Sequence, residues 1–237
     1  MRYGDGMKAL TPVMIAAILA TPQARGAPPA AFPLPQRPVA PIVSPTWGDS
    51  ARRDAAREAE QIAGRLKLRP GMTVADVGAG SGYDSLRLAR IVGPGGAVIA
   101  EDVTARYLQA LKASADAQRL RNIRVVVGSP GDPKLPPASI DAAIMVHMYH
   151  EIERPYELLY NLAPAFRRGG LLGIEEADRA TEAHGTPPAL LTCELRAVGY
   201  RQLSLSAMEG GMGYFAVFAP PAAGQRPAPE RIRACRG

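Results

Sequence analysis

The sequence has few residues of the kinds that bind structural metals or staple small folds together. Its 237 residues include two cysteines, Cys193 and Cys235, and three histidines, and their spacing lacks the close Cys pairs and the HExxH pattern of zinc sites. It also lacks an apolar run of roughly 20 residues, the length needed to span a bilayer. These shortages exclude a disulfide-stapled miniature, and we predict no metal site. The content of 47% apolar and 21% charged residues predicts instead a globular core.

Positive charge is concentrated at the two ends of the chain, although the formal net charge of the whole is only +6. Residues 1–50 carry four basic and two acidic side chains, and residues 220–237 carry four basic and one acidic. The residues between them hold 20 basic and 19 acidic side chains, so the middle of the chain is nearly neutral. Nucleic-acid-binding domains cluster their cations on a folded face. We therefore expect no nucleic-acid partner.

The N-terminal 48 residues divide into two segments by composition. Met7 and Lys8 precede the apolar stretch Ala9–Ala20 and a small-residue region that ends near Ala27, which is the layout of a signal peptide or anchor over residues 1–27. The proline-rich residues 28–48 are predicted to form an extended linker. These features favour an exported protein, periplasmic or membrane-anchored, with membrane contact only through the N-terminal segment. A disordered extension on a cytoplasmic protein is the alternative.

Residues 220–237 are rich in proline and arginine and are predicted to form a disordered basic tail. Cys235 lies in this tail, whereas Cys193 lies in a predicted helix. In an oxidising compartment the two cysteines can pair. We expect Cys193 to be a buried free thiol instead, because free cysteine behaves as a small apolar residue.

Helical and β-type patterns alternate over residues 49–219, which we predict to form one domain. Helices are predicted at 50–66, 83–92, 104–120, 155–166 and 189–198, and strands at 73–77, 97–100, 123–127, 142–146, 171–175, 200–206 and 214–218. This alternation is typical of a doubly wound, Rossmann-like α/β fold with a mostly parallel seven-stranded sheet. A glycine-containing loop joins the last two strands and predicts a C-terminal antiparallel hairpin.

A glycine-rich loop follows the first predicted strand. Gly78, Gly80 and Gly82 let the backbone adopt positive φ and approach a ligand closely. Asp102 ends the next strand, where a carboxylate can accept hydrogen bonds from both ribose hydroxyls of a nucleoside. Dinucleotide sites use GxGxxG to receive a pyrophosphate, whereas this loop reads DxGxGxG. Asp76, just ahead of the loop, favours a cationic ligand over an anionic one.

From about residue 68 to 219 the sequence resembles the class I S-adenosylmethionine-dependent methyltransferase family, of the type that acts on small molecules. The resemblance lies in residues 70–82, 100–103, 131–136, 139–150 and 162–170, where Arg168 stands in place of the usual proline. It implies S-adenosyl-L-methionine as the cofactor, held by Asp76, Gly78, Gly80, Gly82, Tyr83, Glu101, Asp102 and Asp132. Asp102 would take the ribose, with the adjacent Glu101 as a competitor, and Asp132 would lie in the segment that meets the adenine.

The resemblance implies in-line transfer of the sulfonium methyl group to a small-molecule acceptor that the protein aligns and, where needed, deprotonates. Tyr149 and His150 follow the fourth predicted strand, on the ligand side of the sheet, and are our candidates for acceptor positioning or general base. In the competing interpretation His150 bonds to nearby backbone and Tyr149 packs against the cofactor. His147 alternates with apolar neighbours and is expected in the interior. Glu175 and Glu176 are expected at the pocket rim.

Three other functions compete with this one. A protein with this fold can bind the cofactor or a partner without catalysis, because function does not follow from fold. A nucleotide-linked oxidoreductase would bind NAD at the same loop. Within methyltransferases, residues 80–83 are similar to those of protein-isoaspartate methyltransferases, whereas the region of the fourth strand is more similar to small-molecule enzymes.

Overall fold

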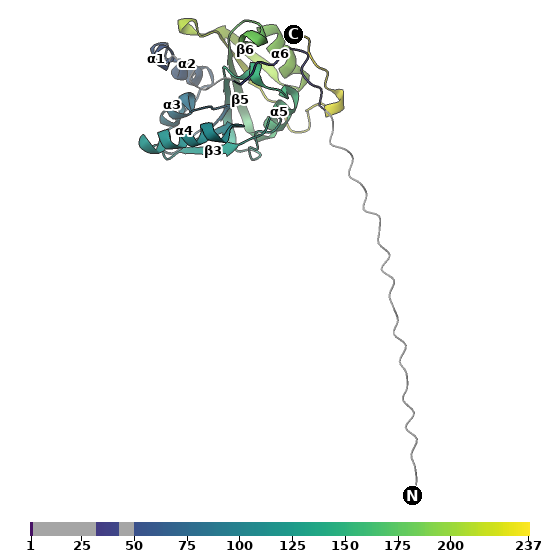
Figure 1. The fold of residues 1–237 in the computed structure, drawn as a ribbon, viewed down its shortest axis with the longest axis horizontal. Helices are drawn as coiled ribbons and strands as arrows, with labels where there is room; N and C mark the ends of the chain where they lie inside the picture. Colours follow the sequence, from purple (N-terminus) through teal and green to yellow (C-terminus); the bar gives the residue numbers. More distant parts are fainter. Residues whose placement is uncertain (2–31, 43–49) are drawn as a thin grey trace. The chain divides into compact units, whose positions relative to one another are not determined.

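The computed structural model describes Met1, residues 32–42 and residues 50–237 (Figure 1). Apart from Met1, the predicted signal or anchor segment lies outside the described residues, as does part of the predicted linker. Residues 31–237 form one compact unit. In the described ranges, no helix has both the length and the apolar character that crossing a bilayer would require.

A seven-stranded sheet in the order β3-β2-β1-β4-β5-β7-β6 organises this unit. Its strands are β1 (Thr73–Val77), β2 (Ala97–Asp102), β3 (Ile123–Val127), β4 (Ile140–Val146), β5 (Phe166–Glu176), β6 (Arg201–Ala207) and β7 (Tyr214–Ala219). The helices of eight or more residues are α2 (Glu58–Arg65), α3 (Tyr83–Val92), α4 (Ala105–Ala117), α5 (Pro155–Leu162) and α6 (Pro188–Ala197). Shorter elements are α1 (Ser50–Ala55), η1 (Tyr149–Glu151), η2 (Ala163–Ala165), η3 (Thr181–Ala183), η4 (Glu209–Gly211) and η5 (Pro229–Arg231).

Strands β1 to β5 pair in parallel, whereas β7 pairs antiparallel with both β5 and β6. The predicted doubly wound sheet with a C-terminal antiparallel hairpin is therefore confirmed. The order changes direction at β1, whose neighbours are β2 and β4. In sheets of this kind ligands bind beyond the carboxyl ends of the strands at such a switch point.

Both faces of the sheet are buried because successive strand residues point to opposite sides. Val74 of β1 and the strand residues on the same face of the sheet pack against α2 and α3. Ala75 and the strand residues on the opposite face pack against α5 and α6. Figure 1 shows these two pairs of helices on opposite sides of the sheet. The chain is thus a three-layer α/β/α domain, in which strands buried on both faces read as apolar runs in the sequence.

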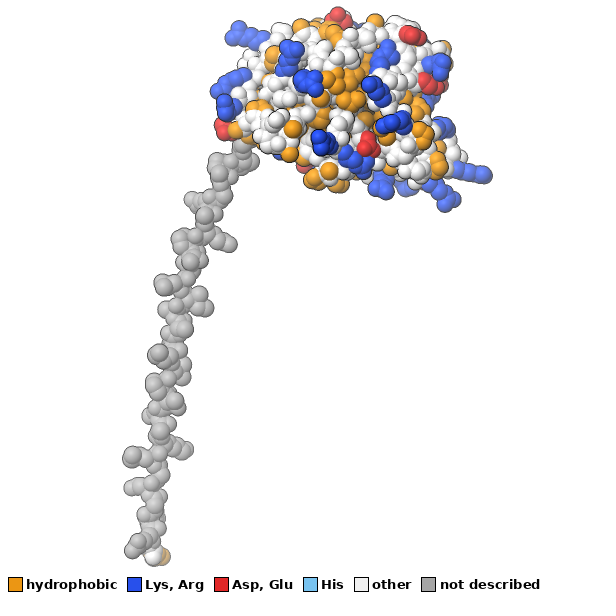
Figure 2. Space-filling view, turned by 180° about the vertical axis from the view of Figure 1, so that it is seen from behind, with side chains coloured by type: hydrophobic (Ala, Val, Ile, Leu, Met, Phe, Trp, Pro, Cys, Tyr) orange, Lys and Arg blue, Asp and Glu red, His pale blue; other side chains and the backbone are white. Residues whose placement is uncertain are grey.

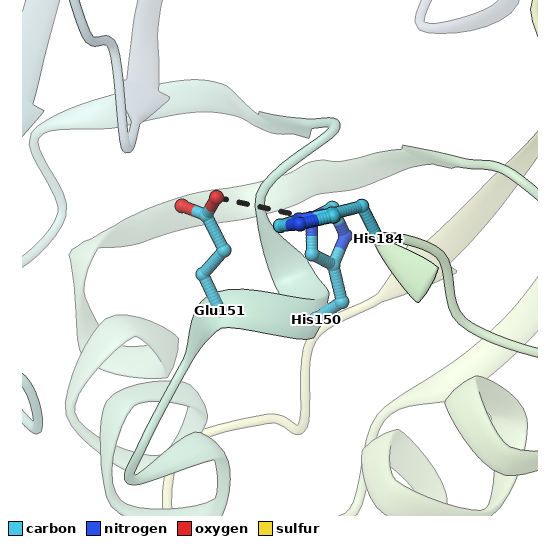
Figure 3. A group of neighbouring side chains, drawn as sticks. All are labelled: His150, Glu151 and His184. Carbon is cyan, nitrogen blue, oxygen red and sulfur yellow. Dashed lines mark ion pairs between the residues drawn. The ribbon is translucent and has the colours of Figure 1, made fainter. Parts of the chain in front are cut away.

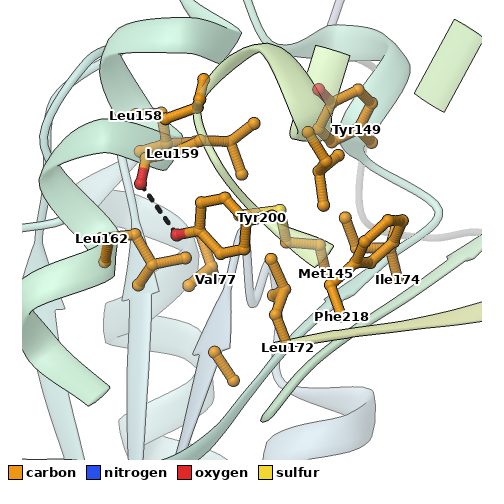
Figure 4. Packing of buried hydrophobic residues seen from close by; sticks show 14 of the residues in the cluster. Val77, Met145, Tyr149, Leu158, Leu159, Leu162, Leu172, Ile174, Tyr200 and Phe218 are labelled. Carbon is orange, nitrogen blue, oxygen red and sulfur yellow. Dashed lines mark hydrogen bonds between the residues drawn. The ribbon is translucent and has the colours of Figure 1, made fainter. Parts of the chain in front are cut away.

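The larger core cluster contains buried tyrosines as well as aliphatic side chains (Figure 4). Tyr200 is 2% exposed, and its hydroxyl donates a hydrogen bond of 2.8 Å to the carbonyl of Leu159 in α5. Tyr149 is fully buried in the same cluster. A buried aromatic hydroxyl needs a polar partner, and the α5 backbone supplies one for Tyr200.

Several predicted boundaries differ from the structure, among them the end of the helix predicted at 155–166, since α5 ends at Leu162. The single helix expected over residues 50–66 is split into α1 and α2, because Arg57 between them adopts φ 54°, a left-handed conformation that a helix cannot continue through. Strand β5 begins at Phe166, five residues earlier than the predicted strand at 171–175, and its pairing with β4 contains a register shift. A bulge of this kind interrupts the alternating pattern from which strands are predicted.

Segments predicted to be a linker and a tail pack on the domain instead. Residues 32–42, which we call the strap, are held at Arg37, whose guanidinium forms a fully buried ion pair of 3.1 Å with Glu194 of α6. In the predicted tail Ile232 is only 3% exposed, so this segment is not the disordered tail we expected. Strap and tail also meet each other, since the amide of Gly237 donates to the carbonyl of Gln36.

Cys193 and Cys235 form a disulfide, so the expected free thiol at Cys193 is wrong. The bond links α6 to the C-terminal segment across 42 residues of sequence. A pattern of two cysteines carries no information on whether they meet, because that depends on how the tail folds back.

Basic side chains on the face drawn in Figure 2 are dispersed among hydrophobic and uncharged ones rather than merged into one groove. Several of the arginines have internal partners. Arg53 pairs with Glu58 and Asp84, and Arg87 pairs with Asp54. Some of the positive charge is therefore neutralised by ion pairs within the fold.

Candidate functional site

A cleft lies at the carboxyl ends of β1, β2 and β4, where the sheet order reverses. It has two adjoining parts that share residues of the strap, the glycine loop, β2 and η1. The shared residues are Ile42, Gly78, Asp102, Met148 and Glu151. The first part is further lined by Val77, Glu101, Val103, Ser129, Pro130, Ile152, Glu153 and Leu158, and the second by Arg53, Asp76, Ala79, Gly80, Ser81, Tyr83, Asp84, Tyr107, Val146 and His147.

The glycine loop between β1 and α3 forms the floor of the cleft. Gly78 and Gly80 have φ values of 74° and 53°, which side-chain-bearing residues adopt rarely. A Cβ atom on Gly78 would lie 2.6 Å from the Cε atom of Met148, so the Met148 side chain would have to move to accommodate any other residue. Gly82 does not line the cleft; it begins α3 and packs against Leu111, whose Cγ would lie 2.4 Å from an added Cβ. Two of the three predicted glycines therefore face the cleft, and the third has a packing role.

Asp102 ties the glycine loop to the end of β2. Its carboxylate accepts a hydrogen bond of 2.9 Å from the amide of Gly80 and another of 2.7 Å from the amide of Thr104. The side chain lines both parts of the cleft. The loop amide at position 80 is therefore already paired with a carboxylate.

Glu101, the predicted competitor of Asp102, also lines the cleft. Burial raises the pKa of its carboxyl to about 8, and the neighbouring Asp102 contributes to the rise. Its Oε1 would lie 1.8 Å from a Cβ on Gly128, so Gly128 makes room for it. Both acids at the end of β2 thus reach the cleft.

Asp76 and Asp84 place further carboxyl groups at the second part of the cleft. Asp76 accepts a hydrogen bond of 2.6 Å from the hydroxyl of Ser85, and burial together with the nearby Asp84 raises its pKa to about 7. Asp84 forms an ion pair of 2.8 Å with Arg53. A cation entering this part of the cleft would be stabilised by the ionised form of Asp76.

Tyr83 lines the cleft as predicted, and its ring lies between two guanidinium groups. The Cζ atoms of Arg53 and Arg87 are each 3.6 Å from the ring centroid. The tyrosine hydroxyl donates to Asp54 at 2.9 Å. Cation–π contacts on both faces hold the ring in a single position at the start of α3.

Asp132 is exposed and does not line the cleft. Its carboxylate accepts a hydrogen bond from the amide of Lys134, and its backbone pairs with Ser129. Ser129 and Pro130, three and two residues earlier, line the cleft in its place. The predicted segment is therefore adjacent to the cleft, but the carboxylate of Asp132 stabilises a turn of the loop instead of facing the cleft.

The predicted catalytic pair, Tyr149 and His150, is buried beneath the strap. Their side chains are 0% and 1% exposed, and neither lines the cleft. The carbonyls of both residues accept hydrogen bonds from Arg37, and the amide of Ala40 donates to His150 as well. The expectation that these two side chains face an acceptor is therefore wrong, because η1 turns them away from the cleft.

His147 takes the position that we predicted for His150. It follows β4 with φ 53° and is 21% exposed in the second part of the cleft, so the expected interior position is wrong. Its Nε2 lies 3.5 Å from a carboxylate oxygen of Glu175 and 3.9 Å from one of Glu58. One signal was available: Val146 is the last residue of the predicted strand, so His147 begins the loop at the ligand edge.

Glu175 and Glu176 end β5 and are fully buried, not at the rim as expected. Burial, reinforced by the nearby Glu58, raises the pKa of Glu175 well above its usual range. Glu176 binds the ring of His150, with its Oε2 2.9 Å from Nδ1. The two neighbouring acids thus serve two different histidines.

Known proteins resemble this chain in part of its sequence and in its fold. Residues 74–170 match the model of a methyltransferase domain. The chain is 37% identical to nocamycin O-methyltransferase of Saccharothrix syringae over 73 residues, which are 31% of this chain and 26% of that protein. It is 28% identical to an arsenite methyltransferase of Halobacterium salinarum over 112 residues, 46% of this chain and 28% of the relative. The matches thus span little more than a quarter of either curated relative.

The fold of this chain also resembles that of a methyltransferase. An S-adenosylmethionine-dependent methyltransferase from Aquifex aeolicus superposes with a TM-score of 0.60 at 24% identity, covering 68% of this chain and 87% of that one. The matched family model runs from β1, through the glycine loop and the acids of β2, to the start of β5. The chain thus resembles methyltransferases in the sequence of residues 74–170 and shares the fold of an S-adenosylmethionine-dependent methyltransferase.

Proposed function

We propose that the protein uses S-adenosyl-L-methionine to methylate a small-molecule acceptor in the cleft. The observation that carries the proposal is the bond between the Gly80 amide and the Asp102 carboxylate. A pyrophosphate at this loop would need that amide and would meet the negative charge of Asp102. A sulfonium and an amino group are instead attracted by carboxylates, and ribose hydroxyls can donate to them.

The cleft residues fit the chemical parts of that cofactor. Asp102 or Glu101 would accept hydrogen bonds from the ribose hydroxyls. Asp76 and the glycine loop would hold the charged methionine portion, and the apolar surface of Val103 and Leu158 suits the adenine. When bound, the cofactor supplies a methyl group activated by a positive sulfur.

His147 is the general base of this proposal. It is the histidine that lines the cleft, and the carboxylates of Glu58 and Glu175 lie within 4 Å of its Nε2. Its imidazole would take the proton from an acceptor hydroxyl or amine as the methyl group forms its new bond. The carboxylate of Glu58 would then stabilise the imidazolium, as in other acid–base sites, whereas the raised pKa of Glu175 keeps that group neutral.

A small acceptor is supported by the form of the cleft and by one relative. The strap residue Ile42 and the η1 residue Glu151 border both parts of the cleft, which leaves a bounded space rather than an open surface. The relative from Saccharothrix syringae is an O-methyltransferase of nocamycin. A protein-isoaspartate substrate would have to bring a polypeptide past the strap.

Ligand-dependent thermal stability tests the cofactor. We expect S-adenosylmethionine and S-adenosylhomocysteine to raise the melting temperature and NAD to leave it unchanged. Gly80→Val and Asp102→Ala should abolish the shift. Gly64→Ala is the matched control, because a Cβ there meets nothing within 4 Å, and it should retain the shift. Stabilisation by NAD and by neither methionine derivative would remove the proposal.

An acceptor screen with methyl-labelled cofactor separates catalysis from binding. Transfer of label to a small molecule supports the proposed enzyme. Binding of cofactor with no transfer across phenols, amines, thiols and isoaspartyl peptides would favour the non-catalytic alternative.

We propose that the protein is exported, on the strength of the N-terminal pattern of residues 1–27 and the Cys193–Cys235 disulfide, since disulfides persist in oxidising compartments. Cell fractionation and N-terminal sequencing of the mature chain test this location. A full-length chain with free thiols in the cytosol would contradict it.

A further inference from the structure

The side chains of three potential metal ligands converge beneath the strap, and one of them, Glu151, also lines the cleft. His150 and Glu151 lie in η1, and His184 follows η3, so two loops that come after different strands contribute (Figure 3). One ligating atom from each residue lies within 4.8 Å of the other two. Figure 3 shows the Glu151 carboxylate and the ring of His184 turned toward the ring of His150.

Glu176 fixes the tautomer of His150. Its carboxylate oxygens lie 2.9 and 3.0 Å from Nδ1, and Oε1 also accepts a hydrogen bond of 2.8 Å from the Tyr149 amide. A carboxylate only accepts, so Nδ1 carries the proton and Nε2 is left with a lone pair. A carboxylate on the far nitrogen of a metal-binding histidine is the usual arrangement around zinc.

The lone pair of His150 points into the cluster without a hydrogen bond. Nε2 is buried, and within the described part of the chain no donor or acceptor lies within hydrogen-bond distance of it. Its neighbours are an oxygen of Glu151 at 3.9 Å and the ring of His184, which packs edge-on at a centroid distance of 5.4 Å. A buried, unpaired nitrogen aimed at a carboxylate and an imidazole is an unsatisfied polar group that a cation would satisfy.

We propose that His150, Glu151 and His184 form a binding site for a divalent transition-metal ion, with Zn²⁺ as the best fit. Two imidazoles and one carboxylate suit Zn²⁺ and leave its fourth position open. Ligand atoms around tetrahedral Zn²⁺ lie about 3.3 Å apart. Rotation of the half-buried Glu151 and His184 closes the observed spacing, while Glu176 holds His150 in place.

The other cluster of potential ligands, Glu58, His147 and Glu175, fits a metal less well. It offers one nitrogen, and its charge is already balanced because Arg53 pairs with Glu58. Arg37 and Arg179 reach this cluster at the backbone carbonyls of His150 and His184, and Glu151 lines the cleft, which provides a route for the ion. Zn²⁺ would therefore sit at the rim of the cleft and join the two loops.

Zinc titration of the full-length chain, stripped with chelator, tests the site by calorimetry and by metal content. We expect one Zn²⁺ per chain, a rise in melting temperature on loading, and little response to Mg²⁺. Co²⁺ in place of Zn²⁺ should give the visible absorption of a four-coordinate nitrogen and oxygen site. None of these readouts depends on methyl transfer, so a failed function proposal would leave them unchanged.

Variants at the half-buried ligands identify the site without disturbing the core. His184→Ala and Glu151→Gln should each weaken Zn²⁺ binding more than tenfold. Glu176→Gln should weaken it about 10–100-fold, the usual effect of removing the partner of a metal-binding histidine. His147→Ala is the matched control and should bind Zn²⁺ like the wild type. No binding by the wild type, or binding lost in His147→Ala and kept in His184→Ala, would overturn the proposal.

Discussion

His147 and His150 lie three residues apart in one loop, yet their surroundings are opposite. His147 is 21% exposed, faces the cleft and is flanked by Glu58 and Glu175. His150 is 1% exposed, lies beneath the strap and is held by Glu176. Met148 between them packs against Gly78 and separates the cleft side from what we call the clamp side, formed by the strap, α6 and the C-terminal segment. A histidine's chemistry is thus decided by the carboxylates that other elements bring to it.

The largest expected effect is on the cleft side, in His147→Gln. Loss of a general base lowers catalytic rates about 10²–10⁴-fold, and we expect a fall in kcat of this size with the acceptor found by the screen. Cofactor affinity and melting temperature should change little, because glutamine keeps the side chain polar. Single-turnover transfer of the labelled methyl group measures the effect.

Lys112→Gln provides the control for that measurement, because Lys112 is 64% exposed on α4 and pairs only with Asp116 in the contacts described here. Its rate should match the wild type. A His147→Gln enzyme of unchanged kcat would break the comparison by showing that the cleft histidine does not move the proton.

On the clamp side, Arg37→Ala should affect folding rather than chemistry. It leaves the buried carboxylate of Glu194 unpaired, and breaking such a pair lowers the free energy of unfolding by about 3–5 kcal/mol. Urea denaturation measures the loss. The double variant Arg37→Met, Glu194→Leu should recover most of it, since apolar residues of similar volume often replace buried ion pairs without penalty.

The double variant could instead remain as unstable as Arg37→Ala. That result would assign the lost stability to the hydrogen bonds from Arg37 to the carbonyls of Tyr149 and His150, and not to the ion pair. That result would sharpen the comparison, because it would place the stabilising contact on the His150 loop itself.

Removal of the disulfide should have a smaller effect on the same side. Because the cysteines are separated by 42 positions in the sequence, Cys193→Ser with Cys235→Ser should lower the free energy of unfolding by about 2–4 kcal/mol through the larger entropy of the unfolded chain. The wild type under reducing conditions should show the same loss. Equal stability of oxidised and reduced wild type would contradict the C-terminal attachment.

The smallest expected effect is on ligand affinity and comes from the pH dependence of the cleft. The pKa values of Asp76 and Glu101 are raised by burial from 3.8 and 4.5 to about 7 and about 8, so between these limits the folded state binds more protons than the unfolded state. Stability contributed by these groups is therefore present below pH 4 and lost as the pH rises through about 8.

A bound cation favours the ionised carboxyls, so affinity for S-adenosylmethionine should rise as the pH goes from 6 to 8.5, by about tenfold or less. S-adenosylhomocysteine has no sulfonium charge and should show a weaker trend. Isothermal titration across this range measures both. Equal pH profiles for the two ligands would show that the carboxyls do not sense the sulfonium.

Local patterns were enough to predict the sheet, the hairpin and much of the cleft. Apolar runs bounded by glycine turns located all seven strands, and the glycine loop with Asp76 and Asp102 located the cleft, because these features act through neighbouring backbone. Asp132 and the catalytic pair were misplaced, since one loop residue turns toward or away from a cleft according to φ and ψ that no periodic pattern records. The φ of 53° at His147 is such a case.

The sequence by itself therefore determined the resemblance to methyltransferases, the layered fold and the chemical character of the cleft, since strand periodicity and glycine spacing are local properties. Only the tertiary structure decided which histidine faces the cleft and that the strap and the C-terminal segment form a clamp. The Arg37–Glu194 pair spans 157 residues and the disulfide spans 42. Contacts at such separations form when the packed core brings distant segments together, and no short window of sequence contains both partners.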